Sequence, residues 1–299
     1  MNLATFEESA KAKHAGMKPA ATWYVRIGRV AAGFMPACFG FTILLVPQLL
    51  LGQQRPLLTE DPRITAPGTV TSELGFGYLD RARFPVSGLG GNELQFLVNG
   101  LHFGLGDRSE FQIAGVAHNF LWVHENGTGR RNDWGDFSLS TKIKLVDEKG
   151  ARPIISFRPT VILPNTNNEK GLGTDGTHFF GSLLFGKTFS RRLFLFGNVG
   201  LGILDDAVRA AAQQDVLAYG IAALFPIHER FRLAAEVNGW DNAQSNPSPG
   251  GEDRSQARLG VQVAAAGVRW DIAATAGLTR WDHRAGVVFG MTKEFRLWK

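Results

Sequence analysis

The chain has 299 residues, among them 36 glycines, 22 phenylalanines and a single cysteine, Cys38. Its formal net charge is +5, but residues 1–52 contain five lysines and arginines against two glutamates, which leaves 27 basic and 25 acidic residues in the remainder. This near balance, without a basic stripe interleaved with aromatic residues, excludes nucleic acid from the expected partners. A lone cysteine excludes a disulfide framework and a cysteine-based metal site.

The N-terminal residues have the features of a targeting segment. Arg26 and Arg29 precede a mainly apolar run at residues 30–51, and a small residue and polar residues follow. This order is typical of a secretory signal, so we expect residues 1–52 to be a signal or targeting segment. The alternative is a membrane-anchoring helix, because a run of 22 residues could span a bilayer. Two prolines within the run and the β-rich remainder favour the signal.

Residues 53–68 are expected to form an irregular periplasmic leader. Their sequence, QQRPLLTEDPRITAPG, contains three prolines and shows no alternation of polar and apolar residues. A strand would need that alternation and would lose ladder hydrogen bonds at each proline. Such a leader could fold into the interior of the domain that follows.

Beyond the leader the chain is a series of strands. The stretch WGDFSLSTKIKL is an example, because Phe137, Leu139 and further apolar residues alternate with polar residues such as Lys142. Successive side chains of a strand point to opposite sides, so this strand has one dry and one wet face. Twelve such strands are expected, at about residues 69–83, 92–106, 109–124, 134–147, 152–164, 177–189, 192–205, 215–227, 230–242, 254–265, 268–279 and 284–298.

The connections between these strands alternate in length. DRS, EKG, SRR, HER and AAG are tight turns, whereas NTNNEKGLGTDG and QSNPSPGGED are long, polar and rich in glycine. Short turns at one end and long loops at the other are typical of outer-membrane barrels. A soluble sandwich with Greek-key crossovers is not expected to sort its loops in this way.

The dry faces are predicted to meet lipid. The expected strands have about 10–15 residues, as a tilted bilayer crossing requires, whereas strands of globular proteins have about 5–6. Pro159 within one strand predicts a local bulge. We therefore expect residues 69–299 to form an all-β, transmembrane, up-and-down antiparallel barrel of about 12 strands in the bacterial outer membrane. Tryptophans near strand ends suit the aromatic girdles of such barrels: Trp122, Trp134, Trp240, Trp270, Trp281 and Trp298.

Three sequence stretches carry a family resemblance. GDFSLSTKIKL, RPIISFRPTVILPNTN and, after a glycine-rich loop, FLFGNVGLG resemble the outer-membrane proteins of the meta-pathway of phenol degradation, which are described as transporters. The matching features include Gly135-Asp136, Lys142, Leu163-Pro164 and Asn198-Val199-Gly200. The resemblance implies an outer-membrane barrel with a transport role, and it offers no catalytic residues.

The last strand, GVVFGMTKEFRLWK, resembles the C-terminal assembly signal of such barrels. Its alternation puts Phe289, Phe295 and Leu297 on one face. The expected partners are therefore outer-membrane lipid, the barrel assembly machinery through this strand, and a small-molecule solute.

Histidines give little support for an enzyme. His118 and His124 are assigned to the polar face of their strand, with no serine placed beside either of them, as a lipase-like site would need. Residues six apart in a strand are about 20 Å from each other, too far to share a metal ion. We expect no enzyme activity, no cofactor and no metal site.

The polar faces supply the lining expected inside the barrel, with six basic and five acidic side chains. About eight strands leave an interior that side chains fill and about sixteen leave an aqueous channel, so twelve lie between these cases. The lining could conduct small solutes, hydrophobic or aromatic ones if the family resemblance holds. Alternatively, it could pair internally in a non-conducting structural or adhesive barrel that acts through its external loops. The lining residues are Glu73, Asp136, Lys142, Lys144, Arg158, Arg232, Glu236, Arg258, Asp271, Glu294 and Arg296. Arg258 is expected to pair with Glu236 or Asp271.

Overall fold

The computed structural model describes residues 55–189 and 193–298. The expected targeting segment, residues 1–52, lies outside the described residues. Among the described residues, no helix is long and apolar enough to cross a membrane.

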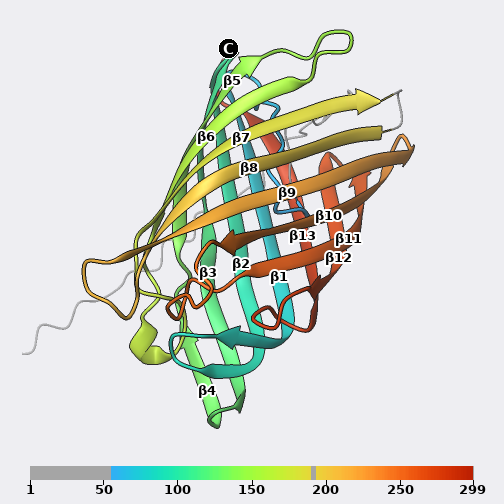
Figure 1. Cartoon of the computed structure of the whole chain (residues 1–299). Helices are drawn as coiled ribbons and strands as arrows, with labels where there is room; N and C mark the ends of the chain where they lie inside the picture. Colours follow the sequence, from blue (N-terminus) through green and yellow to red (C-terminus); the bar gives the residue numbers. More distant parts are fainter. Residues whose placement is uncertain (1–54, 190–192, 299) are drawn as a thin grey trace, which may run out of the picture. The chain divides into compact units, whose positions relative to one another are not determined.

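The described residues form a closed barrel of twelve antiparallel strands (Figure 1). Each wall strand pairs with its neighbour in sequence, and β1 also pairs with β13, which closes the ring. A short extra strand, β4, pairs only with β3. The strands are β1 (Thr69–Phe84), β2 (Leu89–Gly106), β3 (Ser109–Glu125), β4 (Gly129–Asp133), β5 (Phe137–Val146), β6 (Ile154–Leu163), β7 (His178–Phe189), β8 (Leu193–Asp205), β9 (Gln213–His228), β10 (Phe231–Asn242), β11 (Arg254–Ala265), β12 (Val268–Gly277) and β13 (Ala285–Arg296). The 3-10 helix η1 (Asn168–Lys170) lies between β6 and β7.

The twelve-strand up-and-down barrel is confirmed, but the strand expected at residues 134–147 is divided. β3 pairs with β5 over its first half and with β4 over its second half. The chain crosses between these ladders at Gly135, whose amide donates a hydrogen bond to the Val116 carbonyl at 3.0 Å. A Cβ at Gly135 would lie 2.6 Å from atoms of Val116, so only glycine permits this approach.

Pro159 does not produce the expected bulge. It faces Gly181 of β7 in unbroken register. The pairs between β5 and β6 keep one register on either side of it, and the irregularity lies at Lys144 and Val146. Proline therefore removes a hydrogen-bond donor here without shifting the strand.

The two ends of the barrel differ. We name the end with the connections 107–108, 147–153, 190–192, 229–230 and 266–267 the turn end, and it is also where β13 finishes. The opposite end, with the connections 85–88, 126–128, 134–136, 164–177, 206–212, 243–253 and 278–284, is the loop end. The difference in length expected from the sequence is present in part. The longest connections, 164–177 and 243–253, are at the loop end, but 85–88, 126–128 and 134–136 are short, and 147–153 at the turn end is longer than these three.

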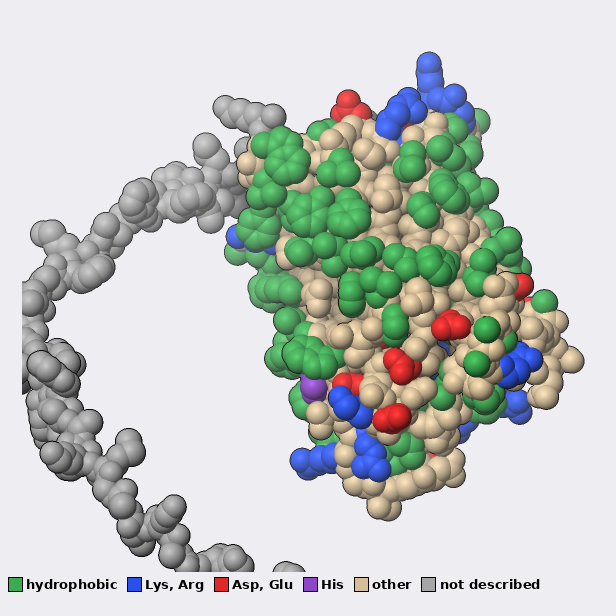
Figure 2. Space-filling model, turned by 90° about the vertical axis from the view of Figure 1, so that its left-hand side faces the viewer, with side chains coloured by type: hydrophobic (Ala, Val, Ile, Leu, Met, Phe, Trp, Pro, Cys, Tyr) green, Lys and Arg blue, Asp and Glu red, His purple; other side chains and the backbone are tan. Residues whose placement is uncertain are grey.

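The outer face of the wall is apolar. Leu201 of β8 is 68% exposed and Leu259 of β11 is 64% exposed, whereas their sequence neighbours Gly200 and Gly260 point inward and are buried. Figure 2 shows one side of this wall, with hydrophobic side chains spread across its middle. A continuous apolar exterior of this kind suits a lipid environment and would be costly in water.

Candidate functional site: a charged lumen crossed by residues 55–68

Residues 55–68, here called the inner segment, lie inside the ring of strands (Figure 1). At its start, the Arg55 guanidinium donates to the Phe289 carbonyl of β13 at 3.0 Å and lies 3.5 Å from the Asp271 carboxylate of β12. Near its end, the Thr65 amide donates to Glu110 of β3 at 2.5 Å. The segment has no helix or strand of its own, so side chains of the wall hold its backbone.

Glu236 of β10 holds the middle of the inner segment. Its carboxylate accepts hydrogen bonds from the amides of Leu58 at 2.8 Å and Thr59 at 2.7 Å. The Arg258 guanidinium lies 3.7 Å from the same carboxylate and donates to the Pro56 carbonyl at 2.8 Å. The expected pairing of Arg258 with an acid of a neighbouring strand thus takes the form of a bridge to the inner segment.

Lys142 of β5 is fully buried beside the inner segment. Its ammonium lies 2.8 Å from Glu60 and 3.2 Å from Glu110, and it donates to the carbonyls of Asp61 and Arg63, both at 2.9 Å. A buried cation is tolerated only when it is paired and hydrogen-bonded. Lys142 therefore fixes the inner segment to two strands at once.

Further polar side chains extend this network around the lumen. The Arg158 guanidinium of β6 lies 3.4 Å from Glu60 and donates to the Gln112 amide oxygen at 2.8 Å. His102 of β2 lies between two carboxylates, 3.2 Å from Glu110 and 3.7 Å from Glu73. The sequence prediction omitted Gln112, His102 and Glu110, although their alternation with apolar neighbours in β2 and β3 is the same signal that identified Lys142.

Another part of the lumen is apolar. Leu57 of the inner segment packs with Phe194 and Phe196 of β8, Ala222 and Leu224 of β9 and Ala234 of β10. The Arg63 guanidinium lies 4.0 Å from the centre of the Phe194 ring. The inner segment therefore contacts both a charged part and an apolar part of the wall, an arrangement that the sequence prediction did not include.

The remaining residues of the expected lining lie away from this network. Arg232 is half-buried on the inner face of β10, and Lys144 lies 2.7 Å from Asp147 at the turn end. Asp136 is at the loop end, where its carboxylate accepts hydrogen bonds from the backbone amides of residues 165 and 166. Glu294 and Arg296 are at the turn end of β13, half-buried and exposed respectively.

His118 and His124 were assigned to the wrong face. The inward-facing residues of β3 are Glu110 and Gln112 near the turn end but Leu121 and Val123 near the loop end. The alternation therefore shifts by one residue along the strand, opposite a left-handed residue of β2, Leu97 with φ of 55°. Such a change moves the following side chains to the other face, so both histidines lie on the outer wall.

The loop end is ordered by carboxylates outside the twelve wall strands. Asp133 of β4 accepts hydrogen bonds from the Asn167 amide at 2.6 Å and from the Lys170 ammonium at 2.7 Å. Burial opposes ionisation of Asp133, but these donors outweigh it and hold its pKa below the usual range. Asp133 therefore fastens the connection between β6 and β7 to the end of β4.

Many polar atoms in the lumen have no hydrogen-bond partner in the protein. Among the described residues, eleven buried side-chain nitrogen and oxygen atoms are in this position, and all belong to the inner segment or to the inner face of the wall. They include the hydroxyls of Thr59, Thr65 and Thr71. Three of the eleven atoms, Arg55 Nε, Arg258 Nε and Asp271 Oδ2, belong to the ion pairs described above. Buried polar groups in proteins are normally satisfied by protein or by ordered water. The lumen therefore has the chemistry of a hydrated space.

Comparison with known proteins identifies the fold. No known protein-family model matches the chain, and no curated protein matches its sequence. The chain is similar in structure to an outer-membrane channel from Pseudomonas putida F1, with a TM-score of 0.59 and 14% identity over 79% of this chain and 98% of that one. The NanC porin has a TM-score of 0.49 with 8% identity over 74% and 97% of the two chains. The translocator domain of the autotransporter NalP from Neisseria meningitidis has a TM-score of 0.45 with 15% identity over 76% and 87%.

At these identities the likeness concerns the fold. A closed antiparallel barrel, an apolar exterior and a polar interior are the requirements of a β-structure that spans a membrane. The chain is therefore a β-barrel of the bacterial outer membrane, and it is similar in fold to a channel of that membrane.

Proposed function

We propose that the protein is an outer-membrane channel for small solutes whose bore is narrowed by the inner segment. The observation that carries the proposal is the set of buried polar atoms along the lumen that have neither a hydrogen bond nor an ion pair in the protein, such as the hydroxyl oxygens of Thr59, Thr65 and Thr71. A lumen that served only as a packed core would satisfy these groups or replace them with apolar ones. Water satisfies them in a conducting bore.

The attachment of the inner segment is consistent with passage of solutes around it. The segment is held by side chains such as Glu236 and Lys142. Its backbone hydrogen-bonds to the backbone of the wall at Gly68, where it joins β1, through Gly104 of β2 and Leu297. The hydrogen bonds from side chains can exchange with water one at a time, unlike a strand ladder. The segment then acts as a constriction that selects by size and charge.

The class of solute follows from two features. The lumen contains an apolar cluster at Phe194 and Phe196 as well as the charges that surround Lys142. A small amphipathic molecule, with a ring or short chain and one polar group, would satisfy both features. The resemblance to the family of the phenol meta-pathway supports hydrophobic or aromatic solutes, and it does so by analogy alone.

Orientation and assembly follow the usual arrangement of these barrels. In such barrels short turns face the periplasm and long loops face outward. The proposal therefore places the turn end in the periplasm. Residues 53–68 then form a periplasmic leader that enters the barrel from this end. β13 presents Phe289 and Phe295, which are 44% and 45% exposed, on its outer face. This strand is the proposed contact for the barrel assembly machinery.

The alternative is a non-conducting structural or adhesive barrel that acts through its external loops. The buried ion pairs around Lys142 favour it, because they could close the bore permanently. Single-channel recording from the refolded mature protein in planar bilayers separates the two functions. Discrete current steps support the channel, and a folded barrel without current supports the alternative. Uptake of phenol-like solutes and of sugars by liposomes containing the protein then identifies the solute class.

A further inference from the structure

The outer wall near the loop end has a hollow with an aromatic lining. Its volume is about 320 Å³, and it is lined by Tyr78, Asn92, Trp122 and His124. Asn92 and Trp122 are directly paired across β2 and β3. Tyr78 is 45% exposed, and it lies two residues along β1 from the exposed Phe76 on the same outward face. The hollow therefore opens toward the outer surface of the barrel and away from the lumen.

Arginines flank this hollow on both sides. The Arg81 amide donates to the Asn92 side-chain oxygen at 3.2 Å, which fixes residue 81 at one edge. At the other edge, the Arg130 guanidinium of β4 lies 5.9 Å from the centre of the Trp122 ring. Within the described part of the chain, neither the Arg81 nor the Arg130 guanidinium has a carboxylate partner within 4.0 Å.

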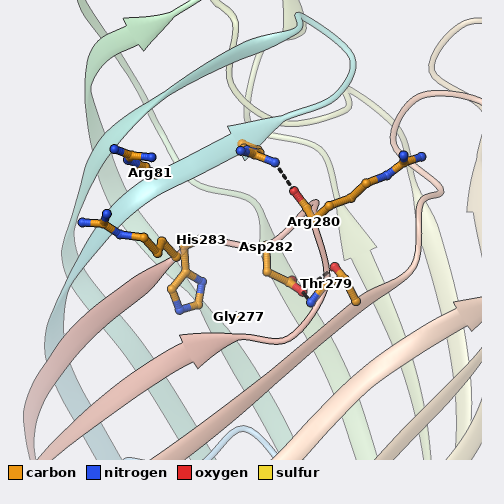
Figure 3. A pocket seen from close by; sticks show the side chains of 8 residues that line it. Arg81, Gly277, Thr279, Arg280, Asp282 and His283 are labelled. Carbon is orange, nitrogen blue, oxygen red and sulfur yellow. Dashed lines mark hydrogen bonds between the residues drawn. The ribbon is translucent and has the colours of Figure 1, made fainter.

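A second, more basic hollow adjoins the first at Arg81. Its volume is about 240 Å³, and its lining includes Arg81, Arg83, Arg280 and Arg284 (Figure 3). Arg83 lies 3.6 Å from Glu125 and Arg284 lies 2.6 Å from Asp80. The Arg280 guanidinium lies 4.8 Å from the centre of the Trp281 ring. We name Arg81, Arg130, Arg284, Tyr78 and Trp122 together the arginine–aromatic face.

The five arginines Arg81, Arg83, Arg130, Arg280 and Arg284 outnumber the three carboxylates beside them, those of Asp80, Glu125 and Asp282. This surplus of guanidinium groups favours an anion. Guanidinium binds phosphate through parallel charge-assisted hydrogen bonds, and it gives up hydration more readily than ammonium does. Aromatic side chains with a polar edge suit the boundary between lipid and headgroup. Phe76 and Phe96, which are 40% and 45% exposed and pack edge to face at 5.4 Å, continue the outer wall toward the lipid. The ligand that fits this face is therefore a phosphorylated headgroup that carries apolar chains.

We propose that the arginine–aromatic face binds a phosphate group of lipopolysaccharide in the outer leaflet. In this arrangement Arg81 and Arg130, at the two edges of the first hollow, contact the phosphate. Arg284, which is paired with Asp80, adds positive charge beside Arg81. Trp122 and Tyr78 contact the sugar to which the phosphate is attached, and the acyl chains cover the wall around Phe76. This site is separate from the lumen and does not depend on whether the barrel conducts, but its place in the outer leaflet rests on the proposed orientation with the loop end outward.

Binding of lipopolysaccharide to the refolded mature protein in a neutral detergent tests the site. The variant combines Arg81→Gln, Arg130→Gln and Arg284→Gln. The matched control removes three exposed cations of the turn end with Arg108→Gln, Lys149→Gln and Arg152→Gln. Heat-modifiable gel mobility first establishes that both are folded. Each protein is then titrated with lipopolysaccharide, with lipopolysaccharide whose lipid phosphates have been removed, and with inorganic phosphate.

The proposal predicts that the unmodified protein and the control bind phosphorylated lipopolysaccharide equally well. The loop-end variant should bind it about tenfold or more weakly, because several charge-assisted contacts are lost. Removal of the lipid phosphates should weaken binding to the unmodified protein by a similar factor. Equal binding by the loop-end variant and the control overturns the proposal. Inorganic phosphate that binds as tightly as the lipid, with the same dependence on the arginines, also overturns it, because the source would then be a soluble anion.

Discussion

The ammonium of Lys142 lies 2.8 Å from the Glu60 carboxylate, and both side chains are buried within the barrel. This pair joins a wall strand to the inner segment. The second carboxylate beside Lys142, that of Glu110, extends the link to β3. The position of the inner segment therefore depends on these buried charges. Removal of any one of them leaves an oppositely charged partner buried without its counter-ion.

Replacement of Lys142 by methionine should destabilise the barrel strongly. Lys142→Met leaves Glu60 and Glu110 buried without their shared cation, and the loss of one partner of a buried pair costs about 3–5 kcal/mol. Lys144→Met is the matched control, because its partner Asp147 is half-exposed and such pairs contribute about 0–1 kcal/mol. Urea unfolding of the refolded proteins in micelles measures both. An equal decrease in the free energy of unfolding for the two variants would contradict the account of the Lys142 network.

A cation introduced on the outer wall tests the assignment of faces. Val261 of β11 lies near the middle of its strand on the lipid side, so Val261→Arg should cost about 2–4 kcal/mol or prevent insertion. Ala265→Arg places the same group at the turn end of the same strand, where the cost should fall to about 0–1 kcal/mol. Urea unfolding in micelles and the yield of folded barrel compare the two variants. If the two variants behave alike, Val261 does not face lipid.

An engineered disulfide tests the position of the inner segment. A side-chain carbon added at Gly220 of β9 would lie 2.7 Å from the Thr59 hydroxyl oxygen. Because the only natural cysteine is Cys38, residues 53–299 provide a background without thiols. Thr59→Cys combined with Gly220→Cys should form a disulfide on oxidation, detected as altered mobility on a non-reducing gel. Thr59→Cys with Gly106→Cys at the turn end is the control and should remain reduced; the opposite pattern would place the segment elsewhere.

The orientation is tested by epitope tags. A tag inserted between Asn246 and Gly251, in the connection from β10 to β11, should be reached by antibody on intact cells because it is at the loop end. A tag at Lys149, in the turn from β5 to β6, should be reached only after the outer membrane is opened. Labelling of the Lys149 tag on intact cells would show that the barrel has the opposite orientation.

The sequence predicts the wall well because each wall strand repeats one local rule. Alternation places Leu259 outward and Arg258 inward, and the structure agrees at both positions. Alternation fails as a guide where strand pairing depends on the length or conformation of a neighbouring strand. The division at Gly135 arises because β3 is longer than β5, and the shift opposite Leu97 moves His118 and His124 to the outer wall. Neither effect can be predicted from local alternation.

The lumen is predictable only in part for the same reason. Lys142, Glu236 and Arg258 can be placed inward from their strands alone. Their partners in the inner segment cannot be predicted, because residues 55–68 have no periodic pattern and their course is determined by the wall around them. The contacts that define the site, such as that between Glu60 and Lys142, join a wall strand to the inner segment, which has no regular secondary structure.

Conductance through the lumen tests the central claim of a channel narrowed by the inner segment. The double variant Glu236→Ala with Arg258→Ala removes both charges that hold residues 56–59 and leaves neither unpaired. In planar bilayers the unmodified protein should give small, discrete current steps. The double variant should give larger or more frequently fluctuating steps, whereas Lys144→Met should match the unmodified protein. Folded unmodified protein and folded double variant that both fail to conduct would contradict the account.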